Sequence, residues 1–100
     1  MIVVNGIFEM QDGAVSAVQP ALAKIEAACK DEAGCHDYTF SVELNSPDVL
    51  RLTEKWDDIA ALRAHFQQPH MADMRNAMSE HPPKSAKVTF FDATEIDPSS

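Results

Sequence analysis

Residues that can exchange protons or hold an apolar ligand lie in two stretches of this chain. His36 and Tyr38 stand close together, and His65 and His70 follow the only tryptophan, Trp56. Histidine titrates near neutral pH, and aromatic side chains offer large flat surfaces. The combination indicates a pocket that holds an apolar, ionisable molecule and exchanges a proton with it. A structural role, with Trp56 in the core and both histidines in solvent, explains the same pattern.

Other catalytic chemistries lack their motifs. His65 and His70 are five residues apart, about 140° around a helix, whereas two metal ligands on one helical face stand four apart. Pro69 between them disturbs that geometry further, and no cluster has zinc-ligand spacing, so we expect no metal. The three glycines form no phosphate-binding loop or dinucleotide fingerprint, and there is no G-x-S-x-G motif. We therefore expect any enzyme activity to need no cofactor.

Length and charge indicate one small acidic domain over residues 1–100. The chain has 8 basic and 16 acidic residues, a net charge of −8 and a pI near 4.7. Such a surface repels nucleic acid and anionic membranes, so we expect neither partner. The start of the chain lacks the pattern of a signal peptide, and the two cysteines are too few for a disulfide framework. We expect a cytoplasmic protein with free thiols.

The first element expected is a strand over residues 2–9, followed by a helix. The strand is apolar on both faces, with Asn5 as a polar exception that either makes a structural hydrogen bond or lines a pocket. One apolar stripe marks the helix: Val15, Val18, Leu22, Ile25 and Cys29. The helix starts either at a Ser16 cap, with Pro20 in its first turn, or near Gly13, with Pro20 bending it. Gly34 is expected to end it.

A hairpin is expected next, and then a second helical region. Strands over residues 38–44 and 49–56 alternate in polarity and flank an expected turn over residues 45–48. Asp57 or Asp58 caps the following helix. Its predicted buried stripe is Ile59, Leu62 and Phe66, with His65 at the stripe's edge, where a pocket mouth would be.

The chain after Pro69 is expected to form a further helix and a last strand. Met71, Met74 and Met78 recur at helical spacing, which is typical of packing but also of adaptable apolar pockets. The last strand covers residues 87–93, with phenylalanines on both faces, and residues 95–100 are expected to be frayed. The order β-α-β-β-α-(α)-β predicts a ferredoxin-like α+β sandwich. The sheet's second face is then apolar in part and uncovered, which predicts a homodimer packed through that face and the last strand, as a dimeric α+β barrel.

Two blocks carry a resemblance to a known family. They are E-A-G-C-H-D-Y, residues 32–38, and, about 16 residues later, E-K-W-D-D-I-A-A-L-R-A-H-F-Q-Q-P-H-M, residues 54–71. Together they cover about 25 residues and resemble the antibiotic biosynthesis monooxygenase superfamily, in particular its small quinol monooxygenases. The resemblance implies a dimeric barrel that oxidises a phenol, quinol or polyketide with molecular oxygen, without flavin or metal.

The resemblance also implies roles for individual residues. His65 is the first candidate for the base and His70 the second. The substrate would meet Asn5, Tyr38 and Trp56, with His36 and Met74 as further candidates. The substrate itself and any assembly beyond the dimer do not follow from the sequence.

Two alternatives to this activity remain. A non-catalytic dimeric barrel that binds a small aromatic or a quinone would show the same pattern, because fold does not fix function. Haem-degrading relatives share the fold but need an axial histidine near the position of Arg75, and they carry a bulky aromatic where this chain has His65. Asn5 does match their polar residue on the first strand. Haem degradation therefore fits less well.

Overall fold

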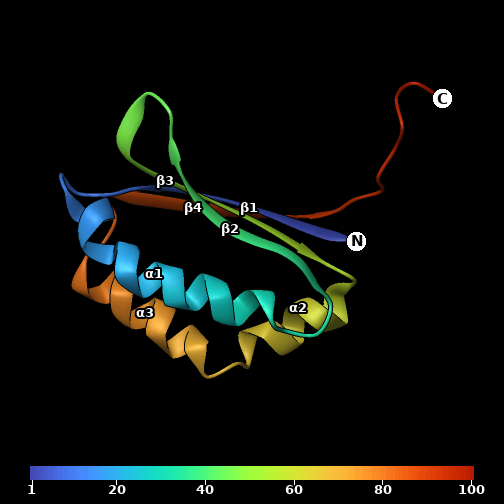
Figure 1. Cartoon of the computed structure of the whole chain (residues 1–100), viewed down its shortest axis with the longest axis horizontal. Helices are drawn as coiled ribbons and strands as arrows, with labels where there is room; N and C mark the ends of the chain where they lie inside the picture. Colours follow the sequence, from blue (N-terminus) through green and yellow to red (C-terminus); the bar gives the residue numbers. More distant parts are fainter.

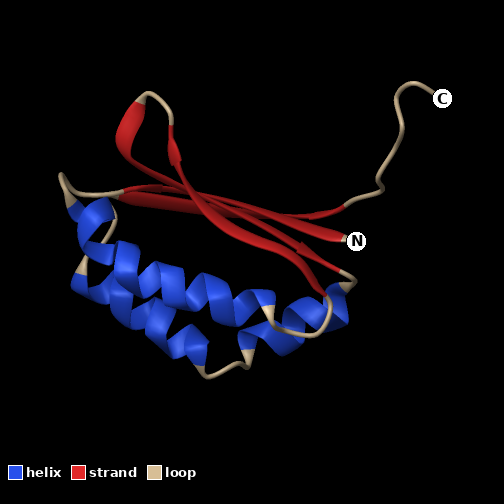
Figure 2. Cartoon of the chain, in the orientation of Figure 1, coloured by secondary structure: helices blue, strands red, loops and turns tan.

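The structure, a computed structural model, describes all 100 residues as one layer of strands and one layer of helices (Figures 1 and 2). The elements follow the order β-α-β-β-α-α-β. Their bounds are β1 Ile2–Glu9, α1 Ala14–Lys30, β2 Cys35–Glu43, β3 Ser46–Trp56, α2 Ile59–Phe66, α3 His70–Glu80 and β4 Ser85–Asp92. This order confirms the predicted ferredoxin-like α+β sandwich.

The four strands form one antiparallel sheet in the order β2-β3-β1-β4. All three helices cover the same face of this sheet, and the C-terminal tail after β4 leads away from it (Figure 1). Because side chains alternate along a strand, each strand sends every second residue toward the helices. None of the three helices combines the length and apolarity needed to cross a bilayer.

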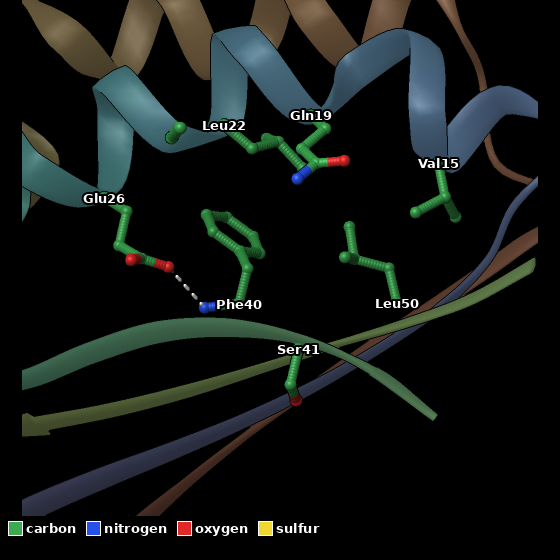
Figure 3. Close-up of a pocket in the computed structure, with 8 residues that line it drawn as sticks. Val15, Gln19, Leu22, Glu26, Phe40, Ser41 and Leu50 are labelled. Carbon is green, nitrogen blue, oxygen red and sulfur yellow. Dashed lines mark hydrogen bonds between the residues drawn. The ribbon is translucent and has the colours of Figure 1, made fainter. Parts of the chain in front are cut away.

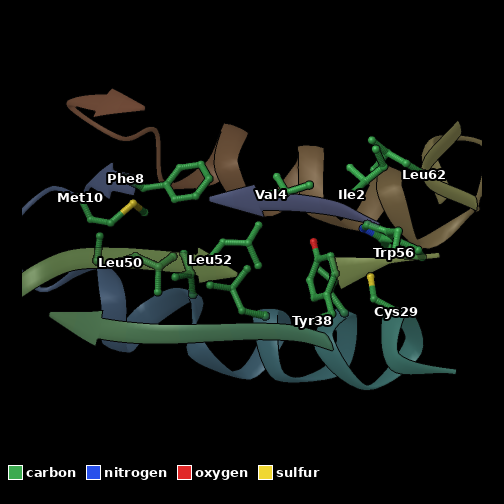
Figure 4. Packing of buried hydrophobic residues seen from close by; sticks show 14 residues of the cluster. Ile2, Val4, Phe8, Met10, Cys29, Tyr38, Leu50, Leu52, Trp56 and Leu62 are labelled. Carbon is green, nitrogen blue, oxygen red and sulfur yellow. The ribbon is translucent and has the colours of Figure 1, made fainter. Parts of the chain in front are cut away.

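The core lies between the sheet and the helices (Figure 4). The alternate residues of β1 and β3 fill its sheet side, and the single stripe of α1 covers them. The buried α1 residues are Ala14, Val18, Leu22, Ile25 and Cys29. This confirms four members of the predicted stripe, while Val15 is partly buried against the same core.

The structure decides between the two predicted starts of α1 and also corrects its predicted end. The helix begins directly after Gly13, whose φ of 76° lies in the left-handed region, so Pro20 stands inside the helix and not in its first turn. The helix ends at Lys30, before Gly34, which was expected to end it. Gly34, with φ 79°, serves the following loop instead: a Cβ there would lie 2.8 Å from the Cβ of Ala61. The loop can therefore approach α2 closely only with glycine.

The β2–β3 hairpin turns two residues earlier than expected. Leu44 and Asn45 form the turn, and Ser46 already pairs with Glu43. Pro47 consequently lies within β3 and not in the turn. The strand tolerates Pro47 because β1 pairs with β3 only from Val49 onward, so no backbone N–H is needed at position 47 to bond to β1.

The buried face of α2 differs from the prediction by one position. Asp58 caps the helix as expected, accepting a hydrogen bond from the Ala61 amide at 2.9 Å. Leu62 and His65 are the buried residues, whereas Ile59 and Phe66 are 45% and 46% exposed. Phe66 packs edge-on against Phe90 of β4, with ring centroids 6.3 Å apart. The helix therefore turns a histidine into the core and a phenylalanine toward the sheet edge.

Candidate functional site

One carboxylate oxygen joins two histidines at the end of the helical layer. Glu32 Oε2 lies 2.8 Å from His65 Nδ1 and 2.8 Å from His70 Nε2. An ionised carboxylate only accepts hydrogen bonds, so both ring nitrogens must donate to it. This fixes the protonated nitrogen of each neutral ring and leaves His65 Nε2 and His70 Nδ1 as acceptors.

Three chain segments bring these groups together. Glu32 follows the end of α1, in the loop whose close approach to α2 depends on Gly34. His65 stands in the last turn of α2, and His70 is the first residue of α3. The helical path is interrupted between the two helices, where Gln67 caps the end of α2 and Pro69 caps the start of α3. The two histidines therefore belong to different helices, and the angle of 140° expected on one helix does not apply.

His65 lies inside the core, with only 1% of the residue exposed. Its ring stacks at a tilt of 36° on Trp56, with centroids 4.6 Å apart, and lies 5.6 Å from the ring of Tyr38. The prediction that His65 stands at a pocket mouth was wrong, because the helix turns this residue fully inward. His65 can hold and orient Glu32, but a substrate cannot reach it directly.

A second buried carboxylate lies on the other side of His65. Glu54 Oε1 accepts a hydrogen bond from Trp56 Nε1 at 2.9 Å and stands 3.9 Å from His65 Nε2. Burial raises the pKa of Glu54 and Glu32 raises it further, while the Trp56 hydrogen bond and His65 oppose the shift. Glu32, His65, Glu54 and Trp56 thus form a row of neighbouring polar side chains inside an apolar core.

Tyr38 and Cys29 close this region from the side of β2 and α1. Figure 4 shows their side chains near Trp56 at one end of the core. Burial is the main cause that raises the pKa of the Tyr38 phenol, followed by the Glu54 carboxylate. Burial, followed by Glu32, likewise raises the pKa of the Cys29 thiol. Both groups stay protonated near neutral pH, so Tyr38 can donate a hydrogen bond but is a poor base.

The groups described so far form one cluster, made of Cys29, Glu32, Tyr38, Glu54, Trp56, His65 and His70. His70 is the member that solvent can reach. Its side chain is 16% exposed, against 7% for Glu32 and 1% for His65. It lines a groove of about 480 Å³ between α1 and α3. Lys24, Asp73, Asn76 and Glu80 give the groove polar walls, and Pro20, Ile25 and Ala77 give it apolar ones. A ligand in this groove would therefore meet the cluster at His70.

A second cleft, of about 240 Å³, lies between α1 and the strands β2 and β3 (Figure 3). It is mostly apolar, with Leu22, Phe40 and Leu50 in its lining. Its one carboxylate, Glu26, already accepts a hydrogen bond from the Phe40 amide at 2.8 Å. The cleft contains no histidine, so it offers an apolar surface without a base.

Not all predicted site residues meet at the cluster. Asn5 pairs with Thr53 and Thr89 on the sheet face away from the helices, where it is exposed. His36 is exposed and bonds to Asp57. Both residues are separated from the cluster, because strand parity turns Asn5 to the far side and the start of β2 turns His36 outward. Met74 is partly buried against the core.

Three residues of the cluster were not singled out from the sequence as site residues. Glu54 points to the same side of its strand as the buried Leu52 and Trp56. A carboxylate at such a position could have been recognised from the sequence as a candidate site residue. Glu32 opens the block of residues 32–38 but carries no periodic signal, because it lies in a loop. Cys29 was recognised as a core residue, which is confirmed, without any link to the histidines.

The fold and a match to a family profile define the class of protein. A profile described as Antibiotic biosynthesis monooxygenase matches residues 1–77, and the chain belongs to this family. The probable quinol monooxygenase YgiN of Escherichia coli is 38% identical in an alignment of 63 positions that covers 55% of this chain and 61% of YgiN. The match thus spans less than two thirds of that relative.

Solved structures give the same class over nearly the whole chain. A protein from Deinococcus radiodurans assigned to the antibiotic biosynthesis monooxygenases is 25% identical, with a TM-score of 0.88 over 97% of this chain and 96% of its own. Protein SO0527 from Shewanella oneidensis is 28% identical, with a TM-score of 0.81 over 90% of this chain and 87% of its own. The resemblance inferred from the two sequence blocks is therefore confirmed at the level of the family.

Proposed function

We propose that this protein is a cofactor-independent monooxygenase that oxidises a small phenol, quinol or polyketide with molecular oxygen. The observation that carries the proposal is the carboxylate of Glu32 held between two histidines, one buried and one open to a groove. Family membership and the activity in the name of the relative YgiN support it. The reaction needs a base that makes the substrate anion, and a site that holds the anion beside oxygen.

The structure favours His70 over His65 as the base. Its Nε2–H donates to Glu32, so Nδ1 is the ring nitrogen that can take a proton from a substrate hydroxyl. The Glu32 carboxylate then stabilises the imidazolium that forms, as a carboxylate does for the histidine of a catalytic dyad. His65 holds the same Glu32 oxygen from the buried side and fixes its position.

The group that reacts with oxygen is the substrate anion, not a protein side chain. The anion gives one electron to dioxygen, and the resulting substrate radical and superoxide combine into a carbon-bound peroxide. When that carbon carries a hydrogen, breaking the O–O bond releases water and leaves a carbonyl group. Two substrate hydrogens and one oxygen atom leave as water, and the other oxygen atom stays in the product. The protonated His70 is placed to return its proton to the departing oxygen.

A second candidate function has its own supporting observation. Trp56 and Tyr38 are fully buried, with 0% and 1% exposure, and pack against His65 instead of lining an open pocket. Their expected role as free walls for an aromatic substrate finds no support in this packing. A barrel that binds a small aromatic or a quinone in the groove, without turnover, remains the alternative function.

We also propose that the protein works as a homodimer. The sheet face away from the helices has no covering layer within the chain, and Val3, Ile7 and Phe91 share it. Phe91 is 47% exposed on this face, while Val88 and Phe90 of the same edge strand are 40% and 50% exposed on the opposite, helix-side face. A second copy that packs through this face and β4 would bury these side chains.

Oxygen uptake tests the main proposal. Metal-free protein with chelator present is supplied with a panel of hydroquinones and a naphthohydroquinone, and oxygen consumption is compared with the autoxidation rate. We expect uptake above that rate with at least one substrate. Saturable quinone binding without oxygen uptake would instead support the binding barrel.

A further inference from the structure

We propose that Cys29, Glu32, His65 and His70 form a binding site for a divalent transition metal, with zinc as the ion that fits best. Each residue offers one ligand atom, and the four atoms all lie within 4.8 Å of one another. The set includes a thiol, two imidazoles and a carboxylate, which represent the three ligand types that zinc takes in proteins. This site lies beyond the proposed oxygenation, which uses no metal.

The distances match a tetrahedral zinc site after small movements. With zinc bonds of about 2.0–2.3 Å, ligand atoms at the corners of a tetrahedron stand about 3.3–3.7 Å apart. Glu32 Oε2 lies 2.8 Å from each histidine nitrogen, so each of these two distances must grow by about half an ångström. The sulfur lies within 4.8 Å of the other ligand atoms, so it must move inward by at most about 1 Å.

A second layer of contacts supports one ligand. Metal-bound histidines commonly direct their other ring nitrogen at a carboxylate, which fixes the ring. To bind the ion, each histidine must shift its ring proton from the nitrogen that faces Glu32 to the other ring nitrogen. In His65 the proton moves from Nδ1 to Nε2, which lies 3.9 Å from Glu54 Oε1. Glu54 is itself held by the indole N–H of Trp56. Glu54 and Trp56 are therefore the outer layer of the metal site, behind the ligand His65.

The groove between α1 and α3 provides the entry route. Cys29 and His65 are fully buried, while His70 is partly exposed and lines the groove. An ion that enters there meets His70 first and then the other three ligands. Because His70 and Glu32 are also the proposed base and its partner, bound zinc is expected to inhibit oxygenation; this consequence, unlike the binding itself, rests on the proposed function.

Metal binding can be measured without any activity assay. Purified full-length protein, stripped with chelator under reducing conditions, is titrated with Zn²⁺ in competition with a chromophoric chelator, and separately with Co²⁺. We expect one ion per chain and a thiolate-to-cobalt charge-transfer band. His70→Gln and Cys29→Ser should each weaken zinc binding at least about 100-fold, and Cys29→Ser should abolish the band.

Two matched controls use the remaining residues of the same types. His36→Gln changes an exposed histidine bonded to Asp57, and Cys35→Ser changes the second thiol. Both should bind zinc as the unchanged protein does. Circular dichroism checks that each variant is folded.

Three results would overturn the site. The unchanged protein could fail to bind Zn²⁺ more tightly than His70→Gln does, which would leave a hydrogen-bonded cluster only. Cobalt could bind without the thiolate band, which would exclude Cys29 as a metal ligand. Equal loss in the control variants would show binding elsewhere. Oxygen uptake in the presence of chelator is scored separately, so either proposal can fail alone.

Discussion

His70 Nε2 lies 2.8 Å from Glu32 Oε2, although 38 positions separate the two residues in the chain. Glu32 follows α1 and His70 begins α3, so the contact joins the ends of two neighbouring helices. It couples a buried carboxylate to a histidine that solvent reaches. The proposed base depends on this pair, and His65 holds the pair from within the core.

Replacing Glu32 with glutamine should lower the rate of oxygen uptake about 100-fold. The amide keeps the size of the side chain but carries no charge to stabilise the imidazolium of His70. Initial rates with the best hydroquinone measure the effect. Glu43→Gln is the matched control, because Glu43 is bound to Arg51 on the surface and should leave the rate unchanged. Equal rates for both variants would exclude a catalytic role for Glu32.

Replacing Glu54 with glutamine should raise the free energy of unfolding at pH 7, by on the order of 1 kcal/mol. Burial raises the pKa of Glu54, so the folded chain binds its proton more tightly than the unfolded chain does. Stability from this group is present below the unfolded pKa near 4.5 and is lost as pH rises through the folded pKa. The amide can still accept from Trp56.

Urea unfolding of both proteins at a series of pH values tests this effect. The gain from Glu54→Gln should be larger at pH 7 than at pH 4. A variant that is less stable than the unchanged protein at pH 7 would show that the charge of Glu54 stabilises the fold.

The protein should lose stability as pH rises above about 9. Burial, followed by Glu32, raises the pKa of Cys35 from 9.0 to about 11, and the pKa values of Cys29 and Tyr38 are raised as well. Above pH 9 the unfolded chain loses protons that the folded chain retains, so the free energy of unfolding falls.

Cys35→Ser isolates one part of this alkaline effect. Cys35 is partly exposed, so solvent screening limits its share to at most about 1 kcal/mol per pH unit between pH 9 and 11. The variant should show a shallower decline across that window in urea unfolding. Identical declines in both proteins would mean that the Cys35 thiol ionises equally in the folded and unfolded chain.

Replacing Phe91 with aspartate should convert the proposed homodimer into a monomer. The carboxylate would be buried beside Val3 in the contact between two sheets, which costs several kcal/mol. Light scattering after size exclusion measures the molar mass. Leu44→Asp, at the hairpin tip where Leu44 is 95% exposed, is the control that should stay dimeric. A Phe91→Asp dimer would move the interface away from this face.

The sequence predicted the architecture because the architecture depends on periodicity. The β-branched strand over residues 2–9, the stripe of α1 and the Asp58 cap are local patterns, and the structure has all three. The turn at Leu44 and the end of α1 were placed less well, because Pro47 and Gly34 are signals that a strand end or a loop can also use.

The site was predicted less completely because it depends on where helices break. His65 and His70 were both singled out, but a single helical repeat placed them on different faces. The break at Pro69 gives each its own helix axis, and that reorientation brings both rings to Glu32. Glu32 itself lies in a loop, where no periodic pattern reveals which way a side chain points.

Oxygen uptake by metal-free His70→Gln, beside the unchanged protein and His36→Gln, tests the central claim most directly. If His70 is the base, its variant should lose at least about 100-fold in rate. His36→Gln, which changes an exposed histidine away from the groove, should keep the rate. Equal uptake by all three proteins would contradict the Glu32–His70 base.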